Sequence, residues 1–216
     1  MLALFDLDNT LLRGDSDHAF GDYLAAHGEV DAHAHRLRND AFYADYQRGE
    51  LDIRAYSEFV LSTLVGRSRD ELAALQTRYL QEVIEPMILS AGQELLEQHR
   101  QRGDTLVIIT ATNSFITAPI ARRMRVDHLL ATEGEIIDGA YSGRIKGIPC
   151  YREGKVLRLQ QWLNEQGHSG HPSCFYSDSH NDLPLLEWVD EAIAVDPDAR
   201  LAAQAQQRGW RQISLR

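Results

Sequence analysis

The sequence has few cysteines, no long apolar run and no excess of basic residues. Its two cysteines, Cys150 and Cys174, stand far apart without CxxC spacing, so we expect reduced thiols and a cytoplasmic location. The apolar run before Asp6 spans about four residues, which is too short for a membrane span or a signal peptide. Lys and Arg number 22 against 32 Asp and Glu, a formal net charge of −10. This balance argues against nucleic acid and anionic membranes as partners, because both select a basic face.

The remaining composition is that of a folded protein. The chain has 216 residues, of which 44% are hydrophobic and 25% charged, enough for a sizeable core in one or two compact units. It shows no internal repeat and no low-complexity segment. The sequence carries no signal for an oligomeric state, so none is predicted.

Two carboxylates, Asp6 and Asp8, follow the first apolar run, Leu2–Phe5. Residues i and i+2 of a strand point to the same side, so both side chains can enter one site where the strand ends. Two carboxylates that close repel each other, and a divalent cation relieves the repulsion. Oxygen ligands favour a hard ion such as Mg²⁺. The alternative is an Asx turn that ends the strand before a helix cap.

Three later segments strengthen the functional interpretation. Thr110 ends a second β-branched run, Lys155 opens a helical pattern, and Asp178 and Asp182 follow a third apolar run. Taken singly, these residues also fit a strand-end hydroxyl, a solvated helix lysine, and the cap and first turn of a helix. Taken together, they supply the carboxylates, hydroxyl and lysine of a phosphoryl-transfer site.

The order of elements predicts an α/β fold. Residues 15–85 show apolar side chains at helical intervals, and Ser90 to Gln93 read as a capping box. We then expect strands at 105–110, 173–178 and 192–195, helices near 115–125, 155–165 and 183–189, and a hairpin over 133–144. Strands alternating with helices predict a doubly wound parallel sheet, whose ligands bind at the carboxyl ends of its strands.

At this point the chain resembles the haloacid dehalogenase superfamily of phosphatases. Its four motifs stand here as Asp6-x-Asp8-x-Thr10, Thr110, Lys155 and Asp178-x-x-x-Asp182, and the resemblance covers essentially the whole chain. It implies a Rossmann-like catalytic core of residues 1–14 and 86–216, with a helical cap domain of residues 15–85 inserted after the first strand. Residues 5–17 and 38–46 look most like the bacterial histidinol-phosphate phosphatases, within the branch that contains the phosphoserine phosphatases.

The resemblance implies a role for each motif acid. Asp6 is expected to be the nucleophile, which forms an aspartyl-phosphate. Asp8 is expected to protonate the leaving alkoxide and then to deprotonate the hydrolytic water. Asp6, Asp8 through its backbone carbonyl, and Asp178 are the expected ligands of Mg²⁺.

The other motif residues are expected to hold the phosphoryl group and to support the site. Thr110, the backbone N–H of Ala111 and Lys155 would bind phosphoryl oxygens. Asp182, with Asn181 beside it, would orient Lys155 or a metal-bound water. The expected partner is therefore a small-molecule phosphate ester.

The cap is expected to choose the substrate. In the phosphoserine enzymes an acid of the cap pairs with the substrate amine, and an arginine of the cap pairs with the substrate carboxylate. The position of the acid is occupied here by Asp15. The position of the arginine is occupied by Val60, although Arg54 could replace the arginine. This pattern favours L-histidinol phosphate, which has an amine and an imidazole but no carboxylate, and hence a step of histidine biosynthesis. The expected substrate contacts are Asp15, Asp17, Tyr43, Tyr46, Glu58 and Asn113.

Three alternatives stay open. A phosphoserine phosphatase and a phosphatase of another small metabolite differ only in the substrate. A phospho-accepting receiver of signalling systems also combines strand-end acids, a hydroxyl and a lysine. The DxD spacing and the long helical insertion count against a receiver.

Overall fold

The computed structural model describes residues 1–167 and 172–216. In this part of the chain the strands form one seven-stranded sheet with the order β4-β3-β2-β1-β5-β6-β7. Neighbouring strands are parallel, except that β3 and β4 are antiparallel. The strands are β1 (Leu2–Phe5), β2 (Thr105–Asn113), β3 (His128–Ile137), β4 (Ala140–Lys146), β5 (Ser173–Ser177), β6 (Glu191–Val195) and β7 (Arg211–Ile213).

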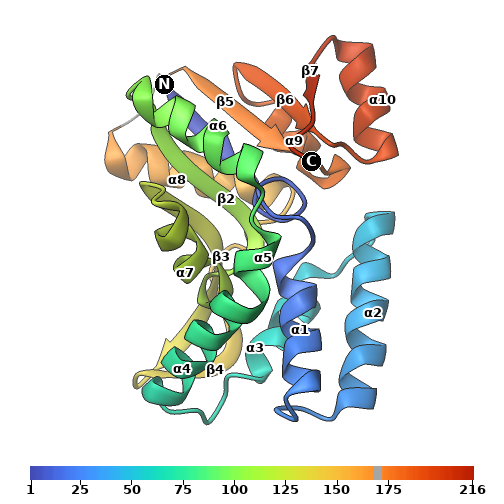
Figure 1. The fold of residues 1–216 in the computed structure, drawn as a ribbon, viewed down its shortest axis with the longest axis vertical. Helices are drawn as coiled ribbons and strands as arrows, with labels where there is room; N and C mark the ends of the chain where they lie inside the picture. Colours follow the sequence, from blue (N-terminus) through green and yellow to red (C-terminus); the bar gives the residue numbers. More distant parts are fainter. Residues whose placement is uncertain (168–171) are drawn as a thin grey trace.

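Helices cover both faces of the sheet (Figure 1). Because side chains alternate along a strand, Ala3 and Phe5 of β1 pack on one face and Leu2 and Leu4 on the other. The first face packs against α6 (Ser90–Gln101) and α7 (Ser114–Met124), and the second against α8 (Glu153–Gln166), α9 (Leu183–Leu186) and α10 (Ala199–Arg208). The predicted doubly wound α/β fold is confirmed.

Strand β1 lies in the middle of the sheet, and its carboxyl end marks the position of the site. Phe5 pairs with Ile108 of β2 on one side and with Tyr176 of β5 on the other. The backbone N–H of Asp6 continues the pairing and donates to the Tyr176 carbonyl over 2.9 Å. Asp6 therefore follows β1 at the edge where β5 also ends, while β2 contains Thr110 and runs on to Asn113, three residues beyond the strand end expected at 110.

The stretch between β1 and α6 is helical, as its apolar spacing predicts. It consists of α1 (Ser16–Ala26), α2 (Ala32–Arg48), α3 (Ile53–Ser62), α4 (Arg69–Tyr79), the π-helical turn η1 (Leu80–Ile84) and α5 (Glu85–Met87). Asp15, Asp31 and Asp52 cap the first three helices through their carboxylates. Figure 1 shows α1 to α4 in the lower half of the picture, where α3 packs on β4 of the hairpin.

One expected helix start is wrong. Ser90 does not cap α6; Leu89 precedes the helix and no side chain caps it. The side chain of Leu89 is buried, and its N–H donates to the Leu11 carbonyl over 3.1 Å. This pairing fixes where the extended chain ends and the helix begins. A capping box does occur at Ser68 and Glu71, at the start of α4.

Both cysteines are free and buried. In residues 1–167 and 172–216, no helix combines the length and apolar character that a membrane crossing requires.

Candidate active site

Lys155 joins two carboxylates at the centre of the site. Its Nζ lies 2.8 Å from Oδ1 of Asp6 and 2.7 Å from the Asp182 carboxylate, and the side chain is almost completely buried. Burial opposes the charged form of Lys155, but the two carboxylates outweigh it and raise the lysine pKa. For Asp6, burial is the stronger effect, and it raises the pKa to about 7 although Lys155 lowers it. Lys155 therefore offsets the effect of burial on Asp6 only in part.

A glycine allows Lys155 to reach this position. Lys155 is the third residue of α8, directly after Gly154. A Cβ atom on Gly154 would lie 2.1 Å from the carbonyl oxygen of Pro149, which no other residue type can tolerate. The glycine thus brings the start of α8 close to the ends of the strands, and the lysine side chain meets Asp6 there.

Asp8 is held by two hydrogen bonds, one to each of its carboxylate oxygens. The backbone N–H of Ser16 donates to Oδ1 over 2.6 Å, and the Thr112 hydroxyl donates to Oδ2 over 2.7 Å. Burial, together with the charge of Asp15, raises the Asp8 pKa to about 7. The side chain is therefore fixed in orientation and close to its protonation midpoint at neutral pH.

Asp178 directly follows β5 and contacts Thr10. The Thr10 hydroxyl donates to Oδ1 of Asp178 over 3.2 Å and accepts from the Asp178 backbone N–H over 3.1 Å. Burial, with smaller contributions from Asp6 and Asp182, raises the pKa of Asp178 well above its usual range. The hydroxyl of the first motif thus connects the ends of β1 and β5.

The donor set fits Mg²⁺. Burial raises the pKa of the Asp178 carboxyl and the charge of Asp6 raises it further, so a divalent cation bound by both carboxylates would relieve this repulsion. The expected set adds the backbone carbonyl of Asp8, and Mg²⁺ usually retains waters at its other positions. Within the described ranges, no group of three or more His, Cys, Asp or Glu side chains converges on a metal-sized site. The expected Mg²⁺ ligands are two carboxylates and one backbone carbonyl, so they do not require a group of three such side chains.

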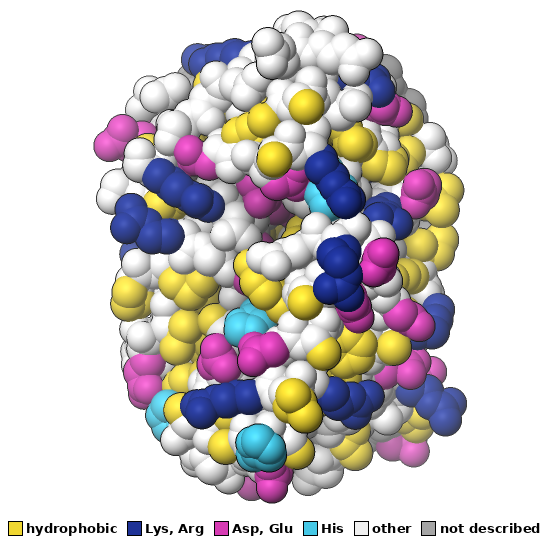
Figure 2. All heavy atoms as spheres, turned by 90° about the vertical axis from the view of Figure 1, so that its right-hand side faces the viewer, with side chains coloured by type: hydrophobic (Ala, Val, Ile, Leu, Met, Phe, Trp, Pro, Cys, Tyr) yellow, Lys and Arg dark blue, Asp and Glu magenta, His cyan; other side chains and the backbone are white. Residues whose placement is uncertain are grey.

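A cavity of about 560 Å³, part of it open to solvent, adjoins these residues. Figure 2 shows a hollow on one face of the molecule with acidic side chains beside it. The core contributes Asp6, Asp8, Thr110, Ala111, Thr112, Tyr151, Lys155, Asn181 and Asp182 to the cavity wall. The helical stretch contributes Asp15, Asp17, Phe42, Tyr43, Tyr46, Leu51, Ile53 and Tyr56. Lys155 is the single Lys or Arg among these residues.

Most of the expected site residues meet at this cavity, but Asp178, Glu58 and Asn113 do not line it. Asn113 caps α7 by accepting from the N–H groups of Phe115 and Ile116. Glu58 follows Tyr56 by two residues in α3, which turns it about 200° around the helix and away from the cavity. Neither Val60 nor Arg54 lines the cavity, and Val60 is buried in the core.

Several residues that line the cavity were not predicted from the sequence. Thr112 lies two residues after Thr110, so strand periodicity alone places it on the same side. Phe42, Tyr56 and Tyr151 had no signal beyond their aromatic character. Tyr151 donates its hydroxyl proton to Oδ1 of Asn181 over 3.0 Å.

The core also binds the carboxyl end of α2, which places the tyrosines of that helix over the site. The last carbonyls of a helix have no partner within it. Here Asn181 donates to the Tyr46 carbonyl over 3.2 Å, Arg200 to the Arg48 carbonyl over 3.0 Å, and Arg152 to the Gly49 carbonyl. These bonds join the helical stretch to the core at the rim of the cavity.

Comparison with known proteins defines the family. Residues 3–187 match the haloacid dehalogenase-like hydrolases, and the chain belongs to this family. It is 44% identical over 213 residues to a histidinol-phosphatase of Neisseria meningitidis, covering 97% of this chain and 96% of that protein. It is 35% identical over 211 residues to a phosphoserine phosphatase of Mycobacterium tuberculosis, covering 96% of this chain and 68% of that protein. The alternative of a signalling receiver is thereby set aside.

Solved structures share the fold. A protein of unknown function from Bordetella pertussis Tohama I matches with a TM-score of 0.93 and 46% identity, covering 100% of this chain and 98% of the other. A substrate-bound phosphoserine phosphatase matches with a TM-score of 0.71, covering 98% of this chain and 91% of the other. Its identity is 16%, so this likeness concerns the fold alone.

Proposed function

We propose that the protein is a Mg²⁺-dependent phosphomonoesterase that acts through an aspartyl-phosphate on Asp6. The observation that carries the proposal is the position of Asp6, which is buried at the end of the central strand, bonded to Lys155 and followed by a fixed Asp8. A phosphate monoester resists an anionic nucleophile, so catalysis depends on positioning and on neutralised charge. Membership of a hydrolase family agrees with this chemistry.

Each half-reaction uses the pair of carboxylates differently. Asp6 attacks phosphorus while protonated Asp8 gives its proton to the leaving alkoxide. Asp8 then takes a proton from the water that hydrolyses the aspartyl-phosphate. The raised pKa of Asp8, about 7, suits both directions of proton transfer. Mg²⁺ held by Asp6, Asp178 and the Asp8 carbonyl would neutralise charge on the phosphoryl group.

Three further groups would hold the phosphoryl oxygens. Thr110 and the backbone N–H of Ala111 lie near the carboxyl end of β2 in the cavity wall, and Lys155 extends from α8 to the same place. Asp182 would keep Lys155 charged and oriented, since the two form an ion pair. Asn181 supports the rim through Tyr151 and the end of α2.

We propose that residues 15–85 act as a cap domain on a core of residues 1–14 and 86–216. The support is the cavity wall, in which eight lining residues come from the helical stretch and nine from the core. The cap would select the alcohol part of the substrate, while the core performs the chemistry.

The proposed substrate is L-histidinol phosphate, which would place the enzyme in histidine biosynthesis. Support comes from the relative that is 44% identical over nearly its full length and from the cavity wall, which has the acids Asp15 and Asp17 but no arginine. The second candidate is phosphoserine, after the relative that is 35% identical. Its carboxylate would lie near buried acids with no arginine to pair with, a costly arrangement.

The test is kcat/KM for L-histidinol phosphate and L-phosphoserine at the same pH and Mg²⁺ concentration. We expect a preference for histidinol phosphate of roughly a hundredfold, since about 3 kcal/mol of discrimination suffices. Equal values, or a preference for phosphoserine, would make phosphoserine phosphatase the better assignment. No activity of the wild type on any phosphomonoester would remove the proposal altogether.

A further inference from the structure

Asp17 is a buried carboxylate in the cavity wall that lacks a partner. Its residue is 5% exposed. Across the described ranges, Oδ1 of Asp17 has no hydrogen-bond partner and its side chain forms no ion pair. An unpaired buried carboxylate is costly, and in proteins such groups are usually paired or hydrogen-bonded. The cost points to a partner that arrives with a ligand.

The neighbouring acid, Asp15, differs from Asp17 in this respect. Oδ1 of Asp15 accepts from the backbone N–H groups of Asp17 and His18, over 2.9 and 2.8 Å, and so caps α1. Part of the hydrogen-bonding capacity of Asp15 therefore serves the helix. Asp17 has no such function in the fold, although it lies in the first turn of the same helix.

Aromatic rings surround this end of the cavity. Tyr56 is close enough that the charge of Asp17 adds to the effect of burial in raising the tyrosine pKa. Phe42 packs on Tyr56 with ring centroids 5.3 Å apart, and both rings line the cavity. Aromatic faces favour flat rings and cations. A carboxylate beside two such rings is therefore complementary to a ring that carries an N–H group.

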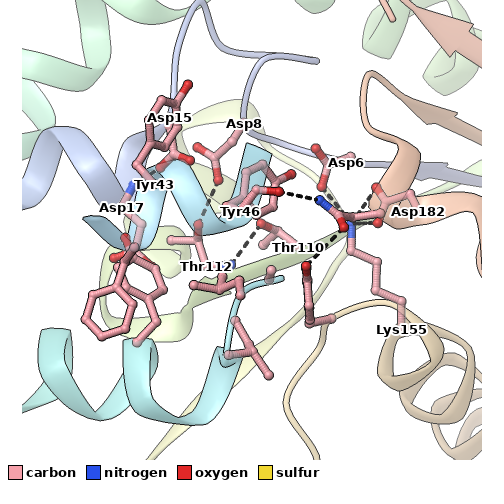
Figure 3. Close-up of a pocket in the computed structure, with 17 residues that line it drawn as sticks. Asp6, Asp8, Asp15, Asp17, Tyr43, Tyr46, Thr110, Thr112, Lys155 and Asp182 are labelled. Atoms are coloured by element: carbon pink, nitrogen blue, oxygen red, sulfur yellow. Dashed lines mark hydrogen bonds and ion pairs between the residues drawn. The ribbon is translucent and has the colours of Figure 1, made fainter. Parts of the chain in front are cut away.

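Asp17 also lies far from the phosphate end of the cavity. Figure 3 shows Asp6, Lys155 and Asp182 together on one side and Asp15, Asp17 and Tyr43 on the other. Separation in one view is a lower limit on separation in space, so a ligand that reaches both ends must be extended. In L-histidinol phosphate the imidazole is the group most remote from the phosphate, and the ammonium lies between them.

We propose that Asp17 is the specificity residue for the leaving group and accepts a hydrogen bond from an imidazole N–H of the substrate, with Phe42 and Tyr56 against the ring. The inference rests on the proposed function, because it assumes that the phosphate occupies the end with Asp6 and Lys155. Asp15 then acts as a positioning residue, since it holds the backbone of Asp17.

The experiment compares Asp17→Asn with Asp22→Asn. Both remove one carboxylate from α1, but Asp22 is exposed and does not line the cavity. We expect Asp17→Asn to lower kcat/KM for L-histidinol phosphate on the order of a hundredfold, and to leave phosphoethanolamine, which has the ammonium but no ring, within about threefold of the wild type. Asp22→Asn should match the wild type on both. Equal losses on the two substrates, or no loss on either, overturn the assignment of the ring to Asp17.

A second measurement needs no turnover. Calorimetric titration with L-histidinol, which carries the ring but no phosphate, should give binding to the wild type and to Asp22→Asn but not to Asp17→Asn. Equal binding to all three overturns the inference. Failure of the proposed function would appear separately, as absent phosphatase activity in the wild type. The melting temperature of ligand-free Asp17→Asn should equal or exceed that of the wild type, and an unfolded variant would show instead that Asp17 serves the fold.

Discussion

The Thr112 hydroxyl donates to Oδ2 of Asp8 over 2.7 Å, between residues 104 positions apart in the chain. Figure 3 shows the pair at the middle of the cavity. The bond stabilises the ionised form of Asp8 and so lowers its pKa, although burial outweighs this effect. A hydroxyl on β2 thus adjusts the acid that is proposed to transfer protons in both half-reactions.

Replacing Thr112 with valine should raise the pKa of Asp8, because the hydrogen bond favours the carboxylate. Hydrogen bonds to charged groups contribute about 1.5–3 kcal/mol, so we expect kcat to fall about 10- to 100-fold where Asp8 must act as a base. The pH–rate profile measures this: the limb assigned to Asp8 should move to higher pH. Thr112→Ser is the control and should keep the wild-type profile. An unchanged pH–rate profile in the valine variant would show that Thr112 does not influence proton transfer by Asp8.

Replacing Asp6 with asparagine should abolish turnover and leave the fold intact. The amide has nearly the shape of the carboxylate but does not form an acyl-phosphate. Circular dichroism and the melting temperature check the fold, and a phosphatase assay checks the activity. Excess EDTA should likewise stop the wild type, and added Mg²⁺ should restore it. Wild-type rates in EDTA, or in the asparagine variant, would refute a metal-assisted aspartyl mechanism.

Removing Lys155 should weaken both stability and activity. Lys155→Met leaves Asp6 and Asp182 buried without their cation, and breaking a buried pair in this way costs about 3–5 kcal/mol. Urea unfolding measures the loss. The double variant Lys155→Met with Asp182→Asn should recover part of the stability but no activity. Near-normal turnover in the single variant would mean that another group binds the phosphate.

The stability of the metal-free protein should fall as the pH rises from about 4 to about 7. Asp6 and Asp8 have pKa values near 7 in the fold against 3.8 ordinarily. The folded state therefore binds more protons than the unfolded state across this range, and the stability that this provides is lost as both acids ionise. Mg²⁺ binds the ionised carboxylates, so it should raise the melting temperature more at pH 7.5 than at pH 5. Melting in EDTA and in Mg²⁺ at both pH values tests this, and a metal effect independent of pH would contradict it.

The sequence predicted that Asp6, Thr110 and Lys155 meet, and all three line the cavity, because each of them follows a strong local pattern. Asp6 follows the apolar strand β1 and Thr110 lies near the carboxyl end of β2, and parallel strands place such ends at one edge of the sheet. Lys155 follows a glycine at a helix start, where its side chain can extend over that edge. The order of motifs along the chain supplied the remaining information through the family resemblance.

The other wall of the cavity was less predictable because it depends on which face of each helix is turned inward. Glu58 and Tyr56 differ by two positions in α3, and only packing decides which of them lines the cavity. Asn113 has the side chain of a ligand-binding residue, but it caps α7. Ser90 has the sequence of a cap but lies inside α6 because Leu89 is buried. For Glu58 and Ser90 packing outweighed a local preference, whereas Asn113 follows a local capping preference.

The central place of β1 has a consequence for biosynthesis. Its two edges pair with strands that begin at Thr105 and at Ser173. At a synthesis rate of about 5–20 residues per second, the strand that precedes Asp6 waits roughly eight to thirty-four seconds for its second neighbour. During that time one apolar edge stays unpaired, which is a typical site of aggregation. A product that stops before Ser173 therefore carries Asp6 on a half-paired strand, and we expect such fragments to depend on chaperones.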